Sequence, residues 1–307
     1  MMIDLTETNT GSIHDALMQT RHKLGGPALG MVLTLVIVTD ESVQYDAVRA
    51  ANEAAREHPC RVLGVITRNP AGRSRLDAEI RLGETGPGET VLLRMHGPLG
   101  EHADSVVTPL VLPDTPVVTW WPGAAPAVPA TDPLGALAQR RITDAAASHH
   151  PRHMLTALAA GYRPGDTDLS WTRATSWRSL LAATLDQPYG AISGGTVSAE
   201  QRNPSADLVT TWLSGRLGVP VQRETSPGPG ITEVRFATTD GDITLSRPDG
   251  RTATLNKPGH TGRRVALQRR DTAELLSEEL RRLDPDEVYA EALARFADHP
   301  VGEEVAG

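Results

Sequence analysis

The strongest constraint on the fold is a near-continuous run of aliphatic and β-branched residues at positions 30–40, GMVLTLVIVTD. Such a run predicts a strand that is buried on both faces of a sheet. Residues 43–57 follow with a helical composition, and CRVLGVIT at positions 60–67 supplies a second buried strand. A strand, a helix and a strand at this spacing form a βαβ unit, so we expect the two strands to be parallel.

The first part of the chain therefore predicts an α/β domain with a mostly parallel sheet at residues 28–165, after an N-terminal arm at residues 1–27. A length of 307 residues also favours two domains over one. The further segments behind this interpretation are an alternating edge strand at 76–81, an apolar helix at 89–99, a strand bracketed by prolines at 113–123, and helices at 132–147 and 151–160.

A change in composition at residues 161–168, GYRPGDTD, predicts the start of a second domain, which we place at residues 166–296. Its pattern is two well-marked helices, a series of strands separated by turns, and two final helices, so we expect an α+β fold with antiparallel strands flanked by helices. The helices are expected at 168–188, 203–218, 271–283 and 285–296. Residues 297–307 are expected to form a flexible tail.

The net charge and the lengths of the apolar runs limit the kinds of partner and the cellular location that we expect for the chain. The net charge is −8, which disfavours a duty on nucleic acid or anionic lipid, because those partners require a clustered basic face. The longest apolar run, at residues 28–38, is far too short to cross a bilayer, so we expect no membrane partner. Residues 1–20 are polar and lack the pattern of a secretion signal, which leads us to expect a cytoplasmic location.

Motifs of catalysis and cofactor binding are sparse in this sequence. No Gly-Lys pair exists for a phosphate-binding loop, and no G-x-S-x-G elbow occurs. His149 and His153 have the spacing of two metal ligands on one helix face, but Pro151 is expected to begin the helix and leave His149 outside it. Cys60 is the single cysteine and is expected to be a small core residue. We therefore predict no catalytic residue, no metal and no cofactor.

The helix expected to begin at Asp168 carries an unusual combination of tryptophan and arginine. Trp177 and the leucines that follow it at helical spacing form an apolar stripe that should face the core. Trp171 and Arg178 belong to a neighbouring face, and Arg173 lies one turn from Trp177. Arginine binds phosphate or carboxylate through two parallel hydrogen bonds, and tryptophan with arginine is typical of binding surfaces. These residues are therefore candidates for binding an anion or a partner, although a core helix with solvated arginines would show the same pattern.

Trp120 and Trp121 form a second aromatic feature, at the end of the strand expected at 113–123. Adjacent strand residues point to opposite faces of a sheet, so the two rings cannot both enter one core face. One of them is therefore a candidate for a surface or a crevice, with burial of both as the alternative.

Four segments, taken in order, resemble the OpcA family of glucose-6-phosphate dehydrogenase assembly proteins in its actinobacterial form. They are HPCRVLGVITRNP, PDTPVVTWWPG, DLSWTRATSWRSLLAATLD and NPSADLVTTWLSGRLGVPV. The resemblance covers roughly residues 28 to 296 and implies a non-catalytic protein. Such a protein would bind glucose-6-phosphate dehydrogenase, favour its active oligomer and support NADPH production in the oxidative pentose phosphate pathway.

The resemblance also marks residues of this chain as family signature positions. They are Trp120, Trp121, Asp168, Trp171, Arg173, Trp177 and Arg178. One departure is Cys60, which stands where the family pattern has serine. With a single thiol, the disulfide-based redox control associated with cyanobacterial members cannot operate within this chain.

Three functions remain open on the sequence alone. The first is an allosteric activator of the dehydrogenase. The second is an enzyme or sensor that holds a sugar phosphate, with Arg173 or Arg178 as the anion clamp. The third is a scaffold that binds the dehydrogenase without changing its kinetics.

Overall fold

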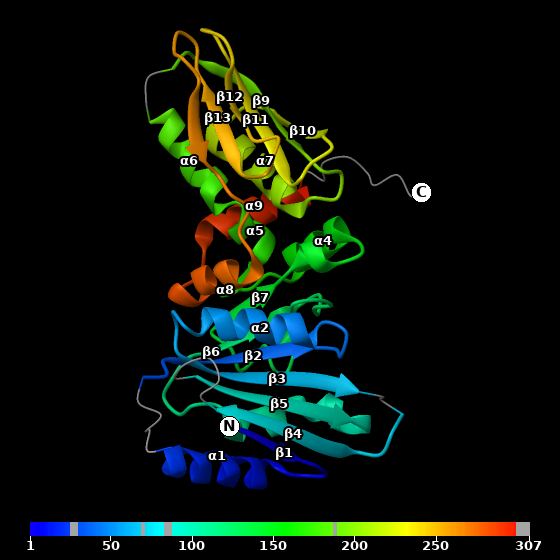
Figure 1. The fold of residues 1–307 in the computed structure, drawn as a ribbon. Coiled ribbons are helices and arrows are strands. Elements are labelled where there is room, and N and C mark those ends of the chain that lie inside the picture. Colours follow the sequence, from blue (N-terminus) through cyan, green and yellow to red (C-terminus); the bar gives the residue numbers. More distant parts are fainter. Residues whose placement is uncertain (25–29, 69–70, 83–87, 187–188, 299–307) are drawn as a thin grey trace. The chain divides into compact units, whose positions relative to one another are not determined.

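A computed structural model describes residues 1–24, 30–68, 71–82, 88–186 and 189–298 (Figure 1). Contacts between Cα atoms divide the chain into two units. The first unit consists of Met1–Asp144, Gly165–Thr167 and Asp271–Pro285. The second unit consists of Ala145–Pro164, Asp168–Arg270 and the residues from Asp286 onward. Each unit contains one sheet and its own apolar core.

The sheet of the first unit has eight strands in the order β1-β4-β5-β3-β2-β6-β7-β8. The central strands β5, β3, β2, β6 and β7 are parallel to one another, whereas β4 is antiparallel to both β1 and β5. The sheet is therefore mostly parallel, as the sequence predicted. The strands are β1 Met2–Leu5, β2 Leu33–Thr39, β3 Cys60–Arg68, β4 Arg75–Leu82, β5 Glu89–His96, β6 Val117–Trp120, β7 Arg140–Thr143 and β8 Asp166–Asp168.

Helices and short 3₁₀ turns pack against this sheet. Ile13 and Leu17 bring α1 into the main core, where Leu63 and Val65 of β3 also lie. Further along the chain, α8 packs against α2 within the first unit. The helical elements are α1 Thr10–Leu24, α2 Gln44–Ala54, η1 Gly97–His102, α3 Ala103–Val107, η2 Thr108–Leu110, η3 Pro129–Thr131 and α8 Thr272–Arg281.

The second unit is built on a six-stranded sheet in the order β10-β9-β11-β12-β13-β14. Every pair is antiparallel except β9 with β10, so the expected α+β fold with antiparallel strands is confirmed. The strands are β9 Ile192–Ala199, β10 Val221–Thr225, β11 Ile231–Thr238, β12 Ile243–Ser246, β13 Thr252–Asn256 and β14 Arg263–Ala266. The helical elements are η4 Ala145–Ala147, α4 Pro151–Gly161, α5 Leu169–Arg173, α6 Thr175–Leu185, α7 Pro204–Leu217 and α9 Glu287–Asp298.

Two helices predicted from the sequence are wrong. Residues 89–99 begin with the strand β5, which lies between β3 and β4 and is almost wholly buried. Its short apolar run fits a buried strand as well as a buried helix, and periodicity alone does not separate the two. Residues 132–147 contain the strand β7 and not a helix. Arg140 and Arg141 of this strand are buried and paired, with Glu279 and Asp166 respectively.

The N-terminal segment is part of the first sheet and core. β1 pairs with β4, so β4 is not the edge strand that its alternating pattern suggested. The two units also exchange segments across the predicted boundary, because residues 145–164 belong to the second unit and 271–285 to the first. The division into domains at 28–165 and 166–296 therefore stays a prediction, and nearly all of the expected tail lies outside the described residues.

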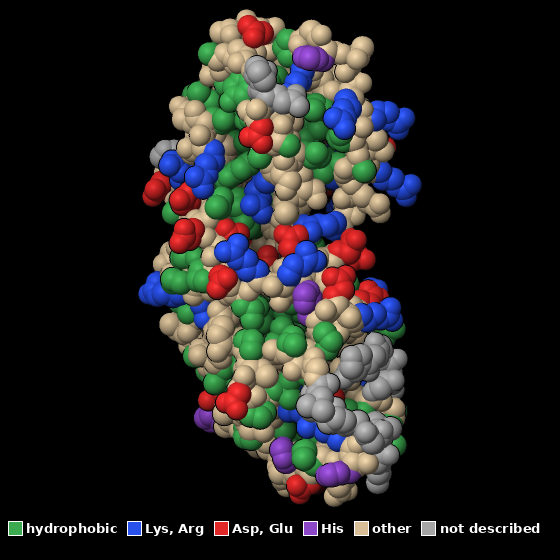
Figure 2. All heavy atoms as spheres, turned by 90° about the vertical axis from the view of Figure 1, so that its left-hand side faces the viewer, with side chains coloured by type: hydrophobic (Ala, Val, Ile, Leu, Met, Phe, Trp, Pro, Cys, Tyr) green, Lys and Arg blue, Asp and Glu red, His purple; other side chains and the backbone are tan. Residues whose placement is uncertain are grey.

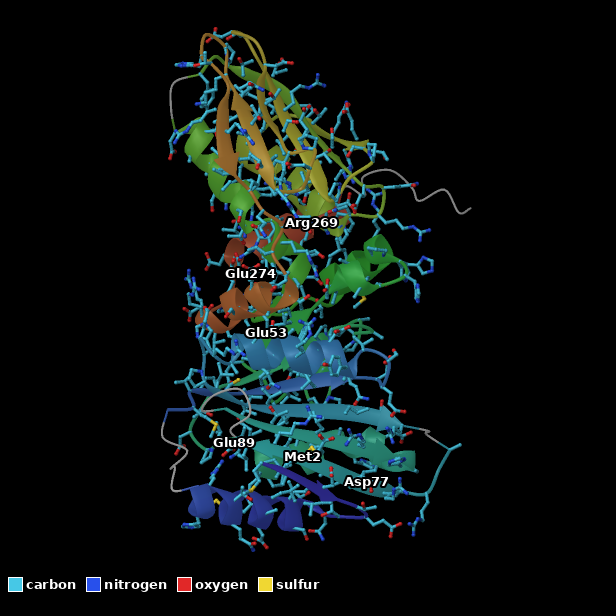
Figure 3. All side chains as sticks on the ribbon, viewed as in Figure 1. Met2, Glu53, Asp77, Glu89, Arg269 and Glu274 are labelled. Carbon is cyan, nitrogen blue, oxygen red and sulfur yellow. The ribbon has the colours of Figure 1, made fainter. Side chains whose placement is uncertain are left out.

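Glu89 links two arginines inside the first unit (Figure 3). Its carboxylate accepts hydrogen bonds from Arg21, at 2.5 and 2.6 Å, and from Arg61, at 3.1 Å. Arg61 lies at the start of β3 and is buried. The carboxylate thus compensates a positive charge that the sheet removes from water.

We expect Glu89→Ala to lower the free energy of unfolding by about 3–5 kcal/mol, because Arg61 would remain buried without its carboxylate. Glu53→Ala is the matched control, since the half-exposed Glu53 pairs with Arg49 on the surface and should contribute at most about 1 kcal/mol. Urea unfolding followed by circular dichroism measures both. Equal losses in the two variants would contradict the role given to Glu89.

Cys60 begins β3 and is completely buried. Burial raises the pKa of its thiol to about 12, so almost no thiolate exists at neutral pH. We expect iodoacetamide to leave the native chain unlabelled under conditions that fully label the urea-unfolded chain. Intact-mass measurement detects the single adduct, and rapid labelling of the native chain would show that the thiol is accessible and reactive.

Candidate functional site

The carboxylate of Asp168 organises the segment that carries the tryptophans and arginines. Asp168 is 0% exposed and accepts hydrogen bonds from the backbone N–H of Ser170 and of Ala145, each at 2.8 Å. The first bond caps α5, and it selects Asp168 from the two capping residues, Asp168 and Ser170, that the sequence left open. The expected single helix is two helices, because Ala174 lies between α5 and α6.

Trp171 is the centre of an aromatic cluster in the second unit. The ring is 1% exposed and packs against Tyr289 and Trp212, with centroid separations of 6.0 and 6.4 Å. Its Nε1–H donates to the carboxylate of Asp286 at 2.8 Å. Trp171 is therefore a core residue whose polar edge is satisfied, and its faces are covered by other side chains.

Arg178 lies over the ring of Trp171, as their spacing along the helix suggested. The guanidinium carbon is 3.7 Å from the ring centroid, which is a close cation–π contact. Its Nη2 donates to the hydroxyl of Thr175 at 3.0 Å. The neighbouring face predicted for Trp171, Thr175 and Arg178 is thus formed, and Arg178, itself half-buried, covers one face of the buried Trp171 ring.

Trp177 faces the core of the second unit together with Leu181, which confirms the predicted stripe. The guanidinium carbon of Arg247 lies 5.1 Å from the centroid of the Trp177 ring. Trp177 and Arg173 line a pocket with three further arginines. We call the residues Arg173, Arg247, Arg269 and Arg270 the arginine pocket.

The arginine pocket is formed by segments that are far apart in the sequence. Arg173 ends α5, Arg247 follows β12, and the other two arginines follow β14. Asn203 and Ser205 contribute the beginning of α7, and Gly230 precedes β11. The pocket has a volume of about 80 Å³, which exceeds the roughly 10–15 Å³ that one water molecule requires.

Trp120 and Trp121 are both buried, at 1% and 2% exposure. The expectation that one of them would reach a surface or crevice is therefore not met. Trp120 ends β6 and Trp121 follows it, and other parts of the first unit cover both rings. A Cβ added at Gly135 would come within 3.1 Å of the Trp121 ring, so this segment lies directly against it.

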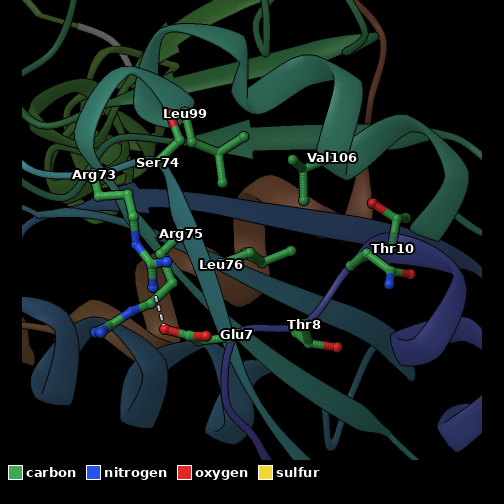
Figure 4. Close-up of a pocket in the computed structure, with 10 residues that line it drawn as sticks. Glu7, Thr8, Thr10, Arg73, Ser74, Arg75, Leu76, Leu99 and Val106 are labelled. Atoms are coloured by element: carbon green, nitrogen blue, oxygen red, sulfur yellow. Dashed lines mark hydrogen bonds and ion pairs between the residues drawn. The ribbon is translucent and has the colours of Figure 1, made fainter.

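Two pockets of the first unit contain ion pairs. One has a volume of about 380 Å³, and there Glu7 forms an ion pair with Arg73 (Figure 4). The other, beside α2, has a volume of about 410 Å³, and its Arg81 and Arg94 both bind Glu79. Burial alone would raise the pKa of Glu79, but the hydrogen bonds from these arginines outweigh it and lower the pKa.

In the described part of the chain, no three His, Cys, Asp or Glu side chains converge as a metal site requires. None of the helices within the described ranges combines the length and apolarity of a membrane span. On the face shown in Figure 2, basic side chains are interspersed with acidic ones.

Comparison with known families matches two models in sequence. Residues 51–160 match the glucose-6-phosphate dehydrogenase subunit N-terminal domain, and residues 164–293 match the corresponding C-terminal domain. The two matches together cover more than half of the chain and carry the OpcA name. The chain belongs to the OpcA family. The resemblance inferred from the sequence is thus confirmed, whereas the actinobacterial type stays a prediction.

A curated relative supports the family, and solved structures give weaker likenesses. The relative is a Synechocystis sp. protein whose name assigns it provisionally to the OxPP cycle as OpcA; it is 26% identical over 58% of this chain and 41% of its own length. An oxidoreductase from Sinorhizobium meliloti has a TM-score of 0.47 at 12% identity, covering 87% of both chains. An NAD binding oxidoreductase from Klebsiella pneumoniae has a TM-score of 0.44 at 9% identity, covering 86% of this chain and 94% of its own. Both TM-scores are too low to indicate a shared fold.

The structure brings Arg173 and Trp177 together with residues that the sequence did not single out. Arg247, Arg269 and Arg270 lie 70 or more positions after Arg173 and Trp177 in the sequence. The chain contains many arginines, so no local pattern distinguished these three. The adjacent pair Arg269-Arg270, directly before the capping residue of α8, was the one available signal. None of the candidate residues is thereby shown to bind a partner.

We expect Trp171→Ala to lower the free energy of unfolding by about 3–5 kcal/mol, because it empties the centre of the aromatic cluster. Trp171→Phe should cost about 1–3 kcal/mol, since it keeps a ring but leaves Asp286 without this donor. Tyr189→Ala, an exposed aromatic residue of the same unit, is the control, with an expected change within about 0.5 kcal/mol. Denaturant unfolding that shows no loss for Trp171→Ala would contradict a core role.

Proposed function

We propose that this chain is a non-catalytic subunit that binds glucose-6-phosphate dehydrogenase and favours its active oligomer. By doing so it would raise NADPH production in the oxidative pentose phosphate pathway. The observation that supports this most is the presence of both subunit domain models, in order, along one chain. The assignment of the Synechocystis sp. relative to the OxPP cycle agrees with it.

The way in which the candidate residues would serve this function follows from their burial. Trp120, Trp121, Trp171 and Trp177 are core residues, so they would hold the units rigid and would not themselves enter an interface. A rigid surface reduces the entropy lost on association, which favours binding without new contacts. Arg173 and Arg178 are half-buried and are the signature residues with side chains that could reach a partner.

Activation places a thermodynamic requirement on the complex. A binding protein shifts the dehydrogenase towards an active assembly only if it binds that assembly more tightly than the inactive form. Equal affinity for the two forms would produce a complex without activation, which is the scaffold alternative. Kinetics and mass must therefore be measured on the same samples.

We expect the purified dehydrogenase of the same host to show a higher kcat/KM when this chain is added, together with a larger mass in light scattering. Half-maximal activation should coincide with half-maximal complex formation, because both report one binding equilibrium. The matched control is the Trp171→Ala variant of this chain, unfolded by heat and added at the same concentration. Unchanged kinetics and unchanged mass would exclude the proposal, whereas a larger mass with unchanged kinetics would favour a scaffold.

A metabolite sensor is the second candidate, and the arginine pocket is the observation that favours it. The sequence alone suggested that the α/β first domain holds a sugar phosphate in the crevice at its strand ends, with Arg173 or Arg178 as the clamp, but both arginines belong to the second unit. Arg173 lines the pocket, whereas Arg178 lies against Trp171. An anion site in the second unit is compatible with activation, since the ligand could gate binding of the dehydrogenase.

A further inference from the structure

Two arginines of the arginine pocket, Arg247 and Arg269, form no ion pair in the described part of the chain. Four arginines line it, and no Asp or Glu is among the described residues that do so. Arg270 donates to the backbone carbonyl of Thr172, and Arg247 donates to the carbonyls of Leu267 and Ile231, at 2.9 Å each. Carbonyl oxygens satisfy hydrogen bonds but carry no net negative charge, so the contacts of Arg247 position its guanidinium group without neutralising it.

Arg247 is the arginine of this pocket whose charge and hydrogen-bond donors are the least compensated. It is 4% exposed, and its Nε is buried without a hydrogen-bond partner in the described part of the chain. Burial, followed by the positive charge of Arg269, lowers the pKa of Arg247 to about 10, although Asp249 acts in the opposite direction. A buried donor that lacks an acceptor, beside a second cation, costs folding free energy unless an anion occupies the space.

The backbone around the pocket is arranged for close approach of an anion. Asn203 caps α7 by accepting a hydrogen bond from the backbone N–H of Ala206, which leaves the N–H of Ser205, in the same first turn, without an acceptor within the helix. The N-terminal end of a 14-residue helix also carries partial positive charge. Gly230 has a φ of +68°, and a Cβ there would lie 3.4 Å from Nη2 of Arg247 and 3.8 Å from Nε of Arg269.

We propose that the arginine pocket binds the phosphate group of a small phosphate monoester. Phosphate presents several strong acceptor oxygens and up to two negative charges, which match several guanidinium groups and a helix N-terminus. A volume of about 80 Å³ is far below the roughly 300–1,000 Å³ of pockets for drug-sized ligands. The pocket therefore takes the charged group, and the organic part of the ligand lies towards the solvent.

The exposure of the four arginines determines which of them can be replaced by alanine without disturbing the fold. Arg269 is exposed, and its side chain forms no described ion pair, so its removal should leave the fold intact (Figure 3). Arg247 is buried, and its loss would confuse folding with binding. Arg235→Ala is the matched control, because Arg235 is an exposed arginine of β11 in the same unit and lies outside the pocket.

The test is isothermal titration calorimetry of the full chain, without the dehydrogenase, at constant ionic strength. The probes are inorganic phosphate, glucose 6-phosphate and glucose. We expect one saturable site for each phosphate probe and no heat with glucose. Arg269→Ala should weaken both phosphate affinities at least tenfold, whereas Arg235→Ala should leave them unchanged and circular dichroism should be the same for all three chains.

Two results would overturn this proposal. One is the absence of saturable binding for both phosphate probes, and the other is equal binding by the wild-type chain and Arg269→Ala. If no phosphate probe binds and Arg269→Ala also abolishes association with the dehydrogenase, the pocket receives an acidic segment of that protein instead. Because binding is measured on the chain alone, these results leave the proposed activation to its own assay.

Discussion

The buried carboxylate of Asp168 is the interaction on which the features of the second unit depend. It accepts hydrogen bonds from two backbone N–H groups, one at the start of α5 and one at Ala145. A helix of five residues has little stability of its own, so its position must come from such a cap and from packing. Trp171 and Arg173 both lie on that helix, and their surroundings therefore follow from this one carboxylate.

Neighbouring residues of α5 and α6 contribute to two different features, the aromatic cluster and the arginine pocket. Trp171 turns into the aromatic cluster, whereas Arg173, with Trp177 of the next helix, lines the arginine pocket. Aromatic burial supplies stability and rigidity, and the arginines placed around it supply charge that is held in one geometry. A tryptophan–arginine signature thus describes a core that positions cations, which differs from an exposed patch of binding residues.

Buried arginines are also what limited prediction from the sequence. The βαβ unit, the capped helix at Asp168 and the hairpin strands followed from patterns of apolar residues and turns, which depend on neighbours in the chain. The strand β7, which was not predicted, contains two buried arginines, Arg140 and Arg141, whose compensating carboxylates, Glu279 and Asp166, lie elsewhere in the sequence. Local patterns do not contain the partners of buried charges.

The sequence by itself determined the class of each fold, the family and the identity of the signature residues, because these depend on periodicity, capping residues and motif order. Only the tertiary structure decided that the four signature tryptophans are core residues and that Arg173 shares a pocket with Arg247 and Arg269. Burial and charge balance depend on which distant segments meet. The physical reason is that a sheet and its connections bring together residues separated by tens of positions, and the free energy of a buried charge is set by those neighbours.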